Sequence, residues 1–278
     1  MSNLCVTGYA SLDYVLDLAT PVAPDQTAHA RKVPDAWPRA GGCPTYISMA
    51  AAQFDQTATP VMWLGDDPLA EQLMDSLTDH GINADGIAKI AHTASPTAVL
   101  LYQPDGTCAC IYDPGLAGQE ALTSAQKKAI TSASHLCISV GPPHLIADMI
   151  ALRTLSSRLY WAVKNDPACF TPDICTQLAQ DADVIFCSTS ERPMIGPTKA
   201  VVVQTMGAKG VRIEDGETIT TLPVTALDVH DATGAGDSFA GGYIAAEMSG
   251  ATTPKKAAQV GIDTAFQLLK NRQKGRTT

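Results

Sequence analysis

Short apolar runs alternate with helix-like stretches along most of this chain, and this alternation restricts the folds open to it. The runs lie at Leu4–Thr7, Val61–Leu64, His135–Val140, Leu159–Val163, Val184–Cys187 and Val201–Gln204. Short apolar runs bounded by turn residues are typical of strands buried on both faces. Since parallel strands need a crossover between them, usually a helix, we predict an α/β protein. Its expected architecture is three α/β/α layers around a central, mostly parallel sheet.

Two stretches interrupt the alternation. Residues 15–40 are rich in proline and polar residues, whereas residues 97–112 read as two strands joined at Pro104-Asp105-Gly106, a strong hairpin signal. A hairpin inserted into a parallel chain does not easily join the main sheet, so we expect both stretches to form a small β-sheet lid. The alternative is that these residues form an extension at the edge of the structure that has no function. At 278 residues the chain is near the size at which one core stops growing, so residues 1–278 are expected to form one domain with this lid.

Composition narrows the classes of partner. The 28 acidic and 19 basic residues give a formal net charge of −9, which argues against a broad nucleic-acid or anionic-membrane surface. No apolar run approaches the roughly 20 residues of a membrane helix, and the N-terminal stretch lacks a signal-peptide pattern. The 8 cysteines show no zinc spacing, so we expect scattered, mostly buried thiols in a reducing compartment. The expected protein is soluble and cytoplasmic, with no nucleic-acid or membrane partner.

The most informative motif is HDATGAGDSF, residues 230–239, which leaves its backbone unusually bare. The small, apolar stretch after it suits a tightly packed helix, so Gly234, Ala235 and Gly236 lie where that helix begins. Unpaired amides and the positive end of the helix dipole attract an anion there, and glycine lets a phosphate approach the backbone. We therefore predict a phosphate cradle at residues 234–236. A nicotinamide dinucleotide site fits less well, because its glycines would follow the first strand.

Asp237 stands at the end of the cradle and has two interpretations. A carboxylate in the first turn of a helix stabilises that helix as a cap. Beside a bound phosphate, the same carboxylate is placed to accept the proton of an attacking hydroxyl. An ordinary aspartate is a weak base at neutral pH. Phosphoryl transfer tolerates a weak base, since its transition state is loose and catalysis is mostly positioning and charge stabilisation.

The stretch DATGAGDSFAGGY resembles the DTxGAGD signature of the ribokinase-like (PfkB-type) carbohydrate and nucleoside kinase family. The resemblance implies that Asp237 is the catalytic base and that the amides of residues 234–236 form the anion hole for the transferred phosphate. Asp231 and Thr233 fall where many members of the family place a loop that binds a monovalent cation such as K⁺.

The acceptor side of the implied site is also similar. Gly41-Gly42 resembles a glycine pair that admits the substrate close to the backbone, and Asp13 occupies the place of an aspartate that binds substrate hydroxyls. Alternatively, Asp13 is a turn or capping residue. The family's glycine pair usually leads to an asparagine that contacts the substrate, but Tyr46 stands there in this chain. A phenol cannot reproduce the donors and acceptor of an amide, so the usual sugar contact is in doubt.

Residues 201–210 (VVVQTMGAKG) resemble the family's turn beside the nucleotide. The matching positions are Thr205, Gly207 and Gly210. Lys209 in the same turn lies either near the phosphates or in solvent.

The family's Asn-x-x-Glu motif, tied to magnesium and phosphate, appears here as Ser188-Thr189-Ser190-Glu191. Glu191 is retained and is suited to act on Mg²⁺ through water, whereas Ser188 is shorter than the usual asparagine. By analogy with the family, residues 257–269 help to wall the adenine site.

These matches imply an ATP-dependent kinase that uses Mg²⁺ to phosphorylate a hydroxyl group of a small sugar or nucleoside, with K⁺ as a candidate second cation. A homodimer through the lid is expected from the same resemblance. The alternative, motivated by Tyr46 and Ser188, is a non-catalytic sensor that binds a sugar or nucleotide and retains the kinase fold. No residue pattern separates the candidate acceptors.

Overall fold

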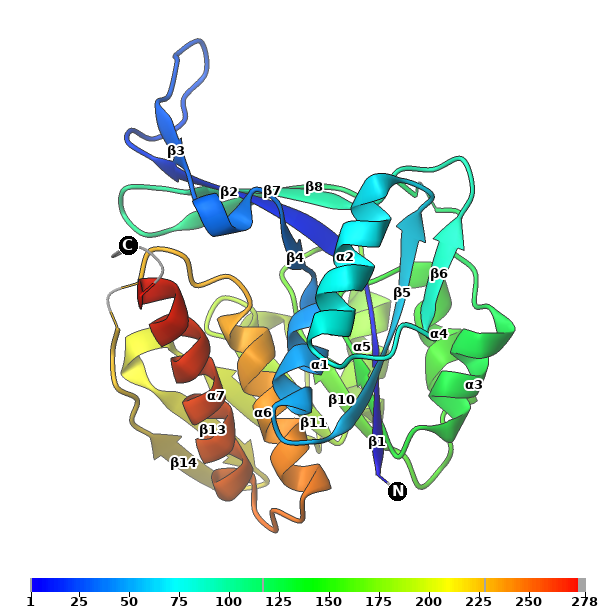
Figure 1. Ribbon diagram of the computed structural model, residues 1–278. Helices are drawn as coiled ribbons and strands as arrows, with labels where there is room; N and C mark the ends of the chain where they lie inside the picture. The colour runs from blue at the N-terminus through cyan, green and yellow to red at the C-terminus, as the bar shows by residue number, and fades with distance from the viewer. Residues whose placement is uncertain (1, 117, 228, 275–278) are drawn as a thin grey trace.

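A nine-stranded sheet runs through the part of the chain that the computed structural model describes, residues 2–116, 118–227 and 229–274 (Figure 1). Its strands lie in the order β14-β13-β12-β11-β10-β9-β1-β5-β6. The strands are β1 (Asn3–Thr7), β5 (Thr57–Gly65), β6 (Ile87–Ile90), β9 (His135–Ile138), β10 (Arg158–Ala162), β11 (Val184–Ser188), β12 (Val201–Thr205), β13 (Val211–Asp215) and β14 (Thr218–Leu222). Residues 1, 117, 228 and 275–278, which the single-domain prediction included, lie outside the described residues.

The pairing of these strands confirms the predicted, mostly parallel sheet. All neighbours from β12 to β6 run parallel, whereas β12–β13 and β13–β14 pair antiparallel. The apolar runs found in the sequence coincide with β1, β5, β9, β10, β11 and β12. Apolar runs do not predict the hairpin β13–β14, because β13 alternates buried and half-exposed residues, as strands do when one face is solvated.

Helices cover both faces of the larger sheet, which gives the three layers (Figure 1). The helices are α1 (Cys43–Ala52), α2 (Pro68–Asp79), α3 (Ser124–Ser132), α4 (Pro143–Leu152), α5 (Pro172–Asp181), α6 (Ala235–Met248) and α7 (Pro254–Lys274). Tyr160 and Trp161, adjacent in β10, point into opposite cores: Trp161 into the core of α3, α4 and α5, and Tyr160 into the core of α1, α6 and α7. Within the described residues, no helix combines the length and apolarity needed to cross a membrane.

A second, five-stranded sheet lies over one end of the larger one (Figure 1). Its order is β3-β2-β7-β8, and β4 pairs with β2. The strands are β2 (Ser11–Leu18), β3 (Ala30–Lys32), β4 (Arg39–Gly41), β7 (Thr97–Tyr102) and β8 (Cys108–Asp113). These strands come from the two stretches that interrupt the alternation, although β2 already begins at Ser11, and β7 and β8 form the hairpin expected at Pro104-Asp105-Gly106.

The cysteines are free, and six of the eight are buried. The expectation of mostly buried thiols is therefore confirmed, and the two exceptions, Cys108 and Cys110, are exposed on β8. Their spacing of two places both side chains on one face of the strand, and both line the cleft described below.

Candidate active site

A cleft of about 730 Å³ lies between the small sheet and the carboxyl ends of the parallel strands. Tyr9, Val140, Lys164 and Ser188, at or just beyond the ends of β1, β9, β10 and β11, line it on one side. Tyr102 and other residues of β7 and β8 line it on the other. Ligands of open α/β sheets bind at the carboxyl ends of the strands, so this cleft is the expected place for a site.

The predicted phosphate cradle borders this cleft at the start of α6. The amide of Ala235 donates to the carbonyl oxygen of Ala232 at 3.1 Å, and Ser238 donates to the carbonyl oxygen of Gly234 at 2.8 Å. The amides of Gly236 and Asp237 lie between these two bonds, among the first amides of a helix, which have no partner inside it. Gly234, Gly236 and Asp237 all line the cleft, so a bound anion can reach the helix start.

The ring of Tyr46 supports the turn that precedes α6. Gly234 has a φ of 74°, in the left-handed region that favours glycine, and a Cβ there would approach the Tyr46 ring to 2.6 Å. The Tyr46 hydroxyl accepts a hydrogen bond from Nη2 of Arg272 at 3.3 Å, and burial raises the pKa of Tyr46 to about 12. Tyr46 does line the cleft, as expected, but its hydroxyl is held by Arg272.

Asp13 reaches the cleft from β2 and is only 3% exposed. Its Oδ1 accepts a hydrogen bond from the Ser11 hydroxyl at 2.6 Å, while burial raises its pKa. Gly41 makes room for this carboxylate, because a Cβ at Gly41 would lie 2.2 Å from Oδ2 of Asp13. Of the predicted glycine pair, Gly42 lines the cleft and Gly41 lies behind Asp13.

Glu191 and Ser188 lie together at the carboxyl end of β11. Oε2 of Glu191 accepts a hydrogen bond from the Ser188 amide at 2.7 Å, and both residues line the cleft. Among the described residues, no three His, Cys, Asp or Glu side chains are grouped to hold a metal ion. A single carboxylate fits Mg²⁺, which usually keeps several waters and binds one or two carboxylates together with substrate phosphates.

The turn after β12 reaches the cleft only in part. Thr205 lines it, whereas Gly207, Lys209 and Gly210 are not among the residues found to line it. Gly207–Lys209 forms a 3₁₀ turn that leads into β13.

Lys164 is a candidate site residue that the motifs did not identify. It lies just beyond β10, lines the cleft and is solvent-accessible. Its pKa is raised by Cys43 and by the carboxylates of Asp237 and Glu191, so its ammonium group stays charged at neutral pH. A signal for it exists in the sequence, since Lys164 follows directly after a predicted parallel strand.

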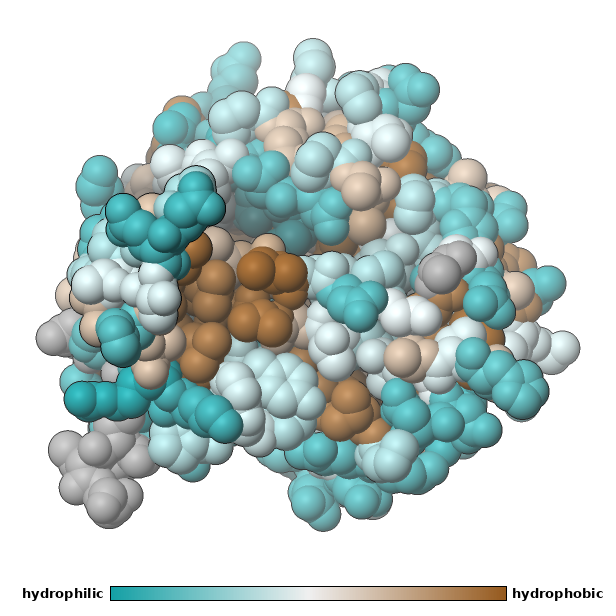
Figure 2. Space-filling view, turned by 90° about the horizontal axis from the view of Figure 1, so that it is seen from above, coloured by the Kyte–Doolittle hydropathy of each residue, from teal (hydrophilic) through white to brown (hydrophobic). Residues whose placement is uncertain are grey.

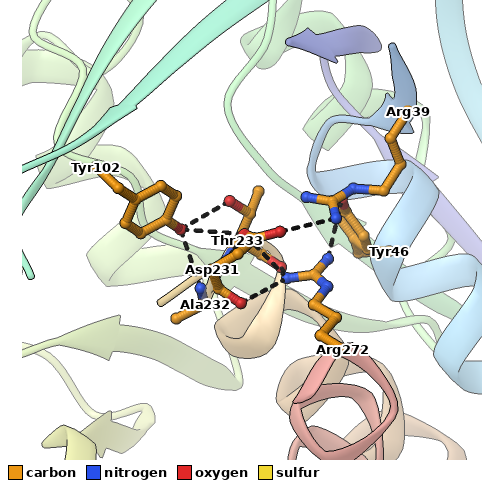
Figure 3. A network of polar contacts seen from close by, with 7 residues as sticks. All are labelled: Arg39, Tyr46, Tyr102, Asp231, Ala232, Thr233 and Arg272. Carbon is orange, nitrogen blue, oxygen red and sulfur yellow. Dashed lines mark hydrogen bonds and ion pairs between the residues drawn. The ribbon is translucent and has the colours of Figure 1, made fainter. Parts of the chain in front are cut away.

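A buried polar network surrounds Asp231 beside the cradle (Figure 3). Oδ2 of Asp231 accepts from Nη1 of Arg39 at 2.8 Å, and Oδ1 accepts from Nη1 of Arg272 at 3.3 Å. The Tyr102 hydroxyl, on β7, lies 2.8 Å from Oγ1 of Thr233 and 3.3 Å from Oδ1 of Asp231. Burial acts to raise the pKa of Asp231, but the hydrogen bond from Arg39 and the charge of Arg272 outweigh it and lower the pKa to about 2.

This network predicts an acid-sensitive contribution to stability. Because the pKa of Asp231 falls from 3.8 to about 2 on folding, its ionised form stabilises the fold above pH 3.8, and this stabilisation is lost as the pH falls towards 2. The pH-dependent part amounts to about 2 kcal/mol. We expect the difference in free energy of unfolding between wild type and Asp231→Asn, measured in urea, to shrink by that amount between neutral pH and pH 2. Asp13, whose raised pKa acts in the opposite direction, is present in both proteins, and only the part of its shift that the charge of Asp231 causes differs between them. A difference that stays constant with pH would contradict the assignment.

The fold and the cleft together define a class of protein. A three-layer α/β/α core, a small sheet over the carboxyl ends of its strands, and a glycine-rich helix start at a shared cleft are the features expected of a ribokinase-like protein. The chain belongs to the pfkB family of carbohydrate kinases, whose model matches residues 1–273.

Individual proteins of known identity are similar over nearly the whole chain. The ribokinase of Bacillus subtilis (strain 168) is 24% identical over 265 residues, which cover 90% of this chain and 87% of that protein. The crystal structure of ribokinase from Cryptococcus neoformans var. grubii serotype A in complex with ADP superposes with a TM-score of 0.79 at 20% identity, covering 95% of this chain and 93% of the other. Arabidopsis thaliana ribokinase, complexed with ribose and ATP, gives a TM-score of 0.76 at 18% identity over 95% and 92% of the two chains.

Proposed function

We propose that this protein transfers the γ-phosphoryl group of ATP to a hydroxyl group of a small sugar or nucleoside. The observation that carries the proposal is that the amide-rich start of α6, Asp237 and the buried Asp13 border one cleft. Membership of a carbohydrate kinase family supports the reaction class. The ribokinases with bound ADP, or with ribose and ATP, support ATP as the donor and a sugar as the acceptor.

In the proposed reaction Asp13 and Gly42 hold the acceptor, and Asp237 orients its hydroxyl group. The bond between the γ-phosphorus and the β–γ bridging oxygen of ATP breaks as the acceptor oxygen bonds to phosphorus. ADP leaves with that oxygen, and the hydroxyl proton passes to Asp237. The amides at residues 234–236 stabilise the charge on the transferring oxygens, with Gly236 the least obstructed of them. This positioning and charge stabilisation accounts for most catalysis of phosphoryl transfer.

The donor side is proposed to use Glu191, Lys164 and Thr205. Mg²⁺, when bound, would neutralise the charge of the β- and γ-phosphate oxygens, and Glu191 would hold it through water. Lys164 adds a positive charge close to Asp237 and Glu191, where phosphate charge accumulates. Thr205 borders the nucleotide, with Gly207, Lys209 and Gly210 in the turn behind it. Residues 257–269 of α7 are proposed to wall the adenine by analogy with the family alone, since none of them is among the residues found to line the cleft.

The acceptor end of the cleft is rich in aromatic side chains. Tyr9 and Tyr112 lie with their ring centroids 5.6 Å apart, one on each side of the cleft, and both line it together with Tyr102. Aromatic faces of this kind suit either the ring of a sugar or the base of a nucleoside, so both acceptor classes stay in the proposal.

A screen for ADP release tests the proposed function. Purified protein with ATP and Mg²⁺ is expected to release ADP when a matching sugar or nucleoside is added, and to release little without one. The alternative is a sensor that retains the kinase fold without activity. It would bind a nucleotide or sugar without any turnover, and the binding would be detected as a rise in melting temperature. Binding with no ADP release across the screened acceptors would favour the sensor.

We also propose that the protein forms a homodimer through the small sheet and acts in the cytoplasm. Figure 2 views the molecule from above, the side on which the small sheet lies in Figure 1, and shows apolar side chains among hydrophilic ones. Three large apolar residues in the segments of the small sheet are exposed, namely Val22 (55%), Trp37 (37%) and Ile111 (60%). Sedimentation velocity decides between this dimer and a monomer.

A further inference from the structure

One nitrogen of Arg272 donates hydrogen bonds to three oxygen atoms of the turn that leads into the phosphate cradle. Nη1 donates to Oδ1 of Asp231 at 3.3 Å, to the carbonyl oxygen of Asp231 at 3.3 Å, and to the carbonyl oxygen of Thr233. Carboxylate and carbonyl oxygens grouped in this way are the ligand set that hard cations prefer. Here a guanidinium group fills that position (Figure 3).

The charges at this turn are balanced from within the chain. The Asp231 side chain is only 4% exposed, and its two cationic partners, Arg272 and Arg39, are 13% and 18% exposed. Asp13 also interacts electrostatically with both guanidinium groups, so two cationic side chains face two carboxyl groups around the turn. Because these groups are largely shielded from water, their interactions are screened less by salt than those of an exposed ion pair.

The same contacts tie together parts of the chain that move independently in an unfolded protein. Arg39 lies in β4 of the small sheet, whereas Arg272 lies near the end of α7, and both reach Asp231 (Figure 3). Arg272 also holds the Tyr46 hydroxyl, and the Tyr46 ring packs against Gly234. Arg272 therefore holds the first amides of α6 in place through two sets of contacts, one with the 231–233 turn and one with Tyr46.

We propose that Arg272 is a positioning residue that replaces a dissociable monovalent cation at the 231–233 turn. Its guanidinium group fixes the turn and supplies the positive charge beside the cradle, so the protein needs no K⁺. The expected effect of Arg272 on turnover rests on the proposed kinase function. Its expected effect on the structure of the turn does not depend on that function. It also replaces the K⁺ site that Asp231 and Thr233 suggested in the sequence.

The first test needs no substitution. Wild-type protein is compared in potassium chloride and in tetramethylammonium chloride of equal ionic strength, because tetramethylammonium is too large for an oxygen-lined cation site. Melting temperature is measured for every sample, and ADP release is measured with an acceptor from the screen. The expected result is equal melting temperatures and equal rates in both salts. A melting temperature or rate that rises specifically with K⁺ overturns the proposal.

The second test removes the guanidinium group. Arg272→Ala is expected to lower kcat at least about tenfold, since a small displacement of positioning groups has large effects on rate. Guanidinium chloride at a few tens of millimolar is expected to restore part of that loss. Lys270→Ala, which removes a positive charge from the same helix, and wild type should show no such rescue. Unchanged kcat in Arg272→Ala overturns the proposal.

Two further measurements separate a failure of the inference about Arg272 from a variant that does not fold and from a failure of the proposed function. If Arg272→Ala does not fold, Arg272→Lys retains a charge but not the planar donor set, and lower kcat with a retained fold is the expected result. If no acceptor gives turnover in wild type, the proposed function fails, but the melting temperatures in the two salts still decide the inference about Arg272.

Discussion

Replacing Asp237 with asparagine is expected to lower kcat by about 10³-fold, because general acid–base groups contribute about 10²–10⁴-fold to enzymatic rates. Asparagine keeps the size of the side chain but cannot accept the hydroxyl proton. In the proposed site the nucleotide phosphates contact backbone amides rather than this carboxylate, so nucleotide affinity should be largely retained. Steady-state ADP release gives kcat, and a fluorescent nucleotide or calorimetric titration gives the affinity.

The chain offers a matched control for the interpretation of Asp237 as a helix cap. Asp173 also lies in the first turn of a helix, α5, but it is exposed and is not among the residues found to line the cleft. Asp173→Asn should therefore reproduce any loss from the helix dipole, a few tenths of a kcal/mol to about 1 kcal/mol, without the loss of kcat. Equal activity in Asp237→Asn and Asp173→Asn would show that Asp237 is a cap and not the base.

Gly236→Ala is expected to lower kcat by about 10²-fold, the usual cost of losing one donor to a developing anion. A Cβ at Gly236 meets no atom within 4 Å, and its backbone does not need a positive φ. The methyl group therefore fits the free protein but occupies the approach of the phosphate to the helix start. Since alanine lowers the conformational entropy of the unfolded chain relative to glycine, the free energy of unfolding should stay equal or rise by about 0.4–1 kcal/mol.

The opposite signs of these two effects make Gly236→Ala a sharp test. A fall in activity with equal or greater stability separates blocked phosphate binding from general misfolding. Gly196→Ala is the matched control, because Gly196 is also exposed, also has open space at its Cβ position and is not among the residues found to line the cleft. Its activity should equal that of wild type. An unchanged kcat in Gly236→Ala would argue against the cradle.

The sequence predicted the larger sheet well because its evidence is local. Strands such as β1 and β11 are buried on both faces, so each appears as an uninterrupted apolar run. The hairpin β13–β14 was not predicted, because β13 alternates buried and half-exposed residues and β14 is mostly exposed, so neither strand is an apolar run. The small sheet was predicted from a turn signal and from the departure of two segments from the alternation, whereas its strand order depends on pairings between distant segments.

The cradle could likewise be placed from sequence, since a helix start and its bare backbone are properties of adjacent residues. Asp13 and the glycine pair were predicted as neighbours only through a family resemblance. The structure supplies the physical reason for Gly41, which is the space that Asp13 needs. Lys164 carried a weaker signal, its position after a parallel strand.

Sequence alone thus determined the α/β class, the strands buried on both faces, and a helix start suited to bind an anion, because each depends on residues close together in the chain. Only the tertiary structure decided what surrounds that helix start. Arg39, Tyr102 and Arg272 reach Asp231 from positions 192, 129 and 41 residues away. Each is an ordinary residue in its own segment, and the Asp231 carboxylate stays ionised after burial only because folding brings those donors together around it.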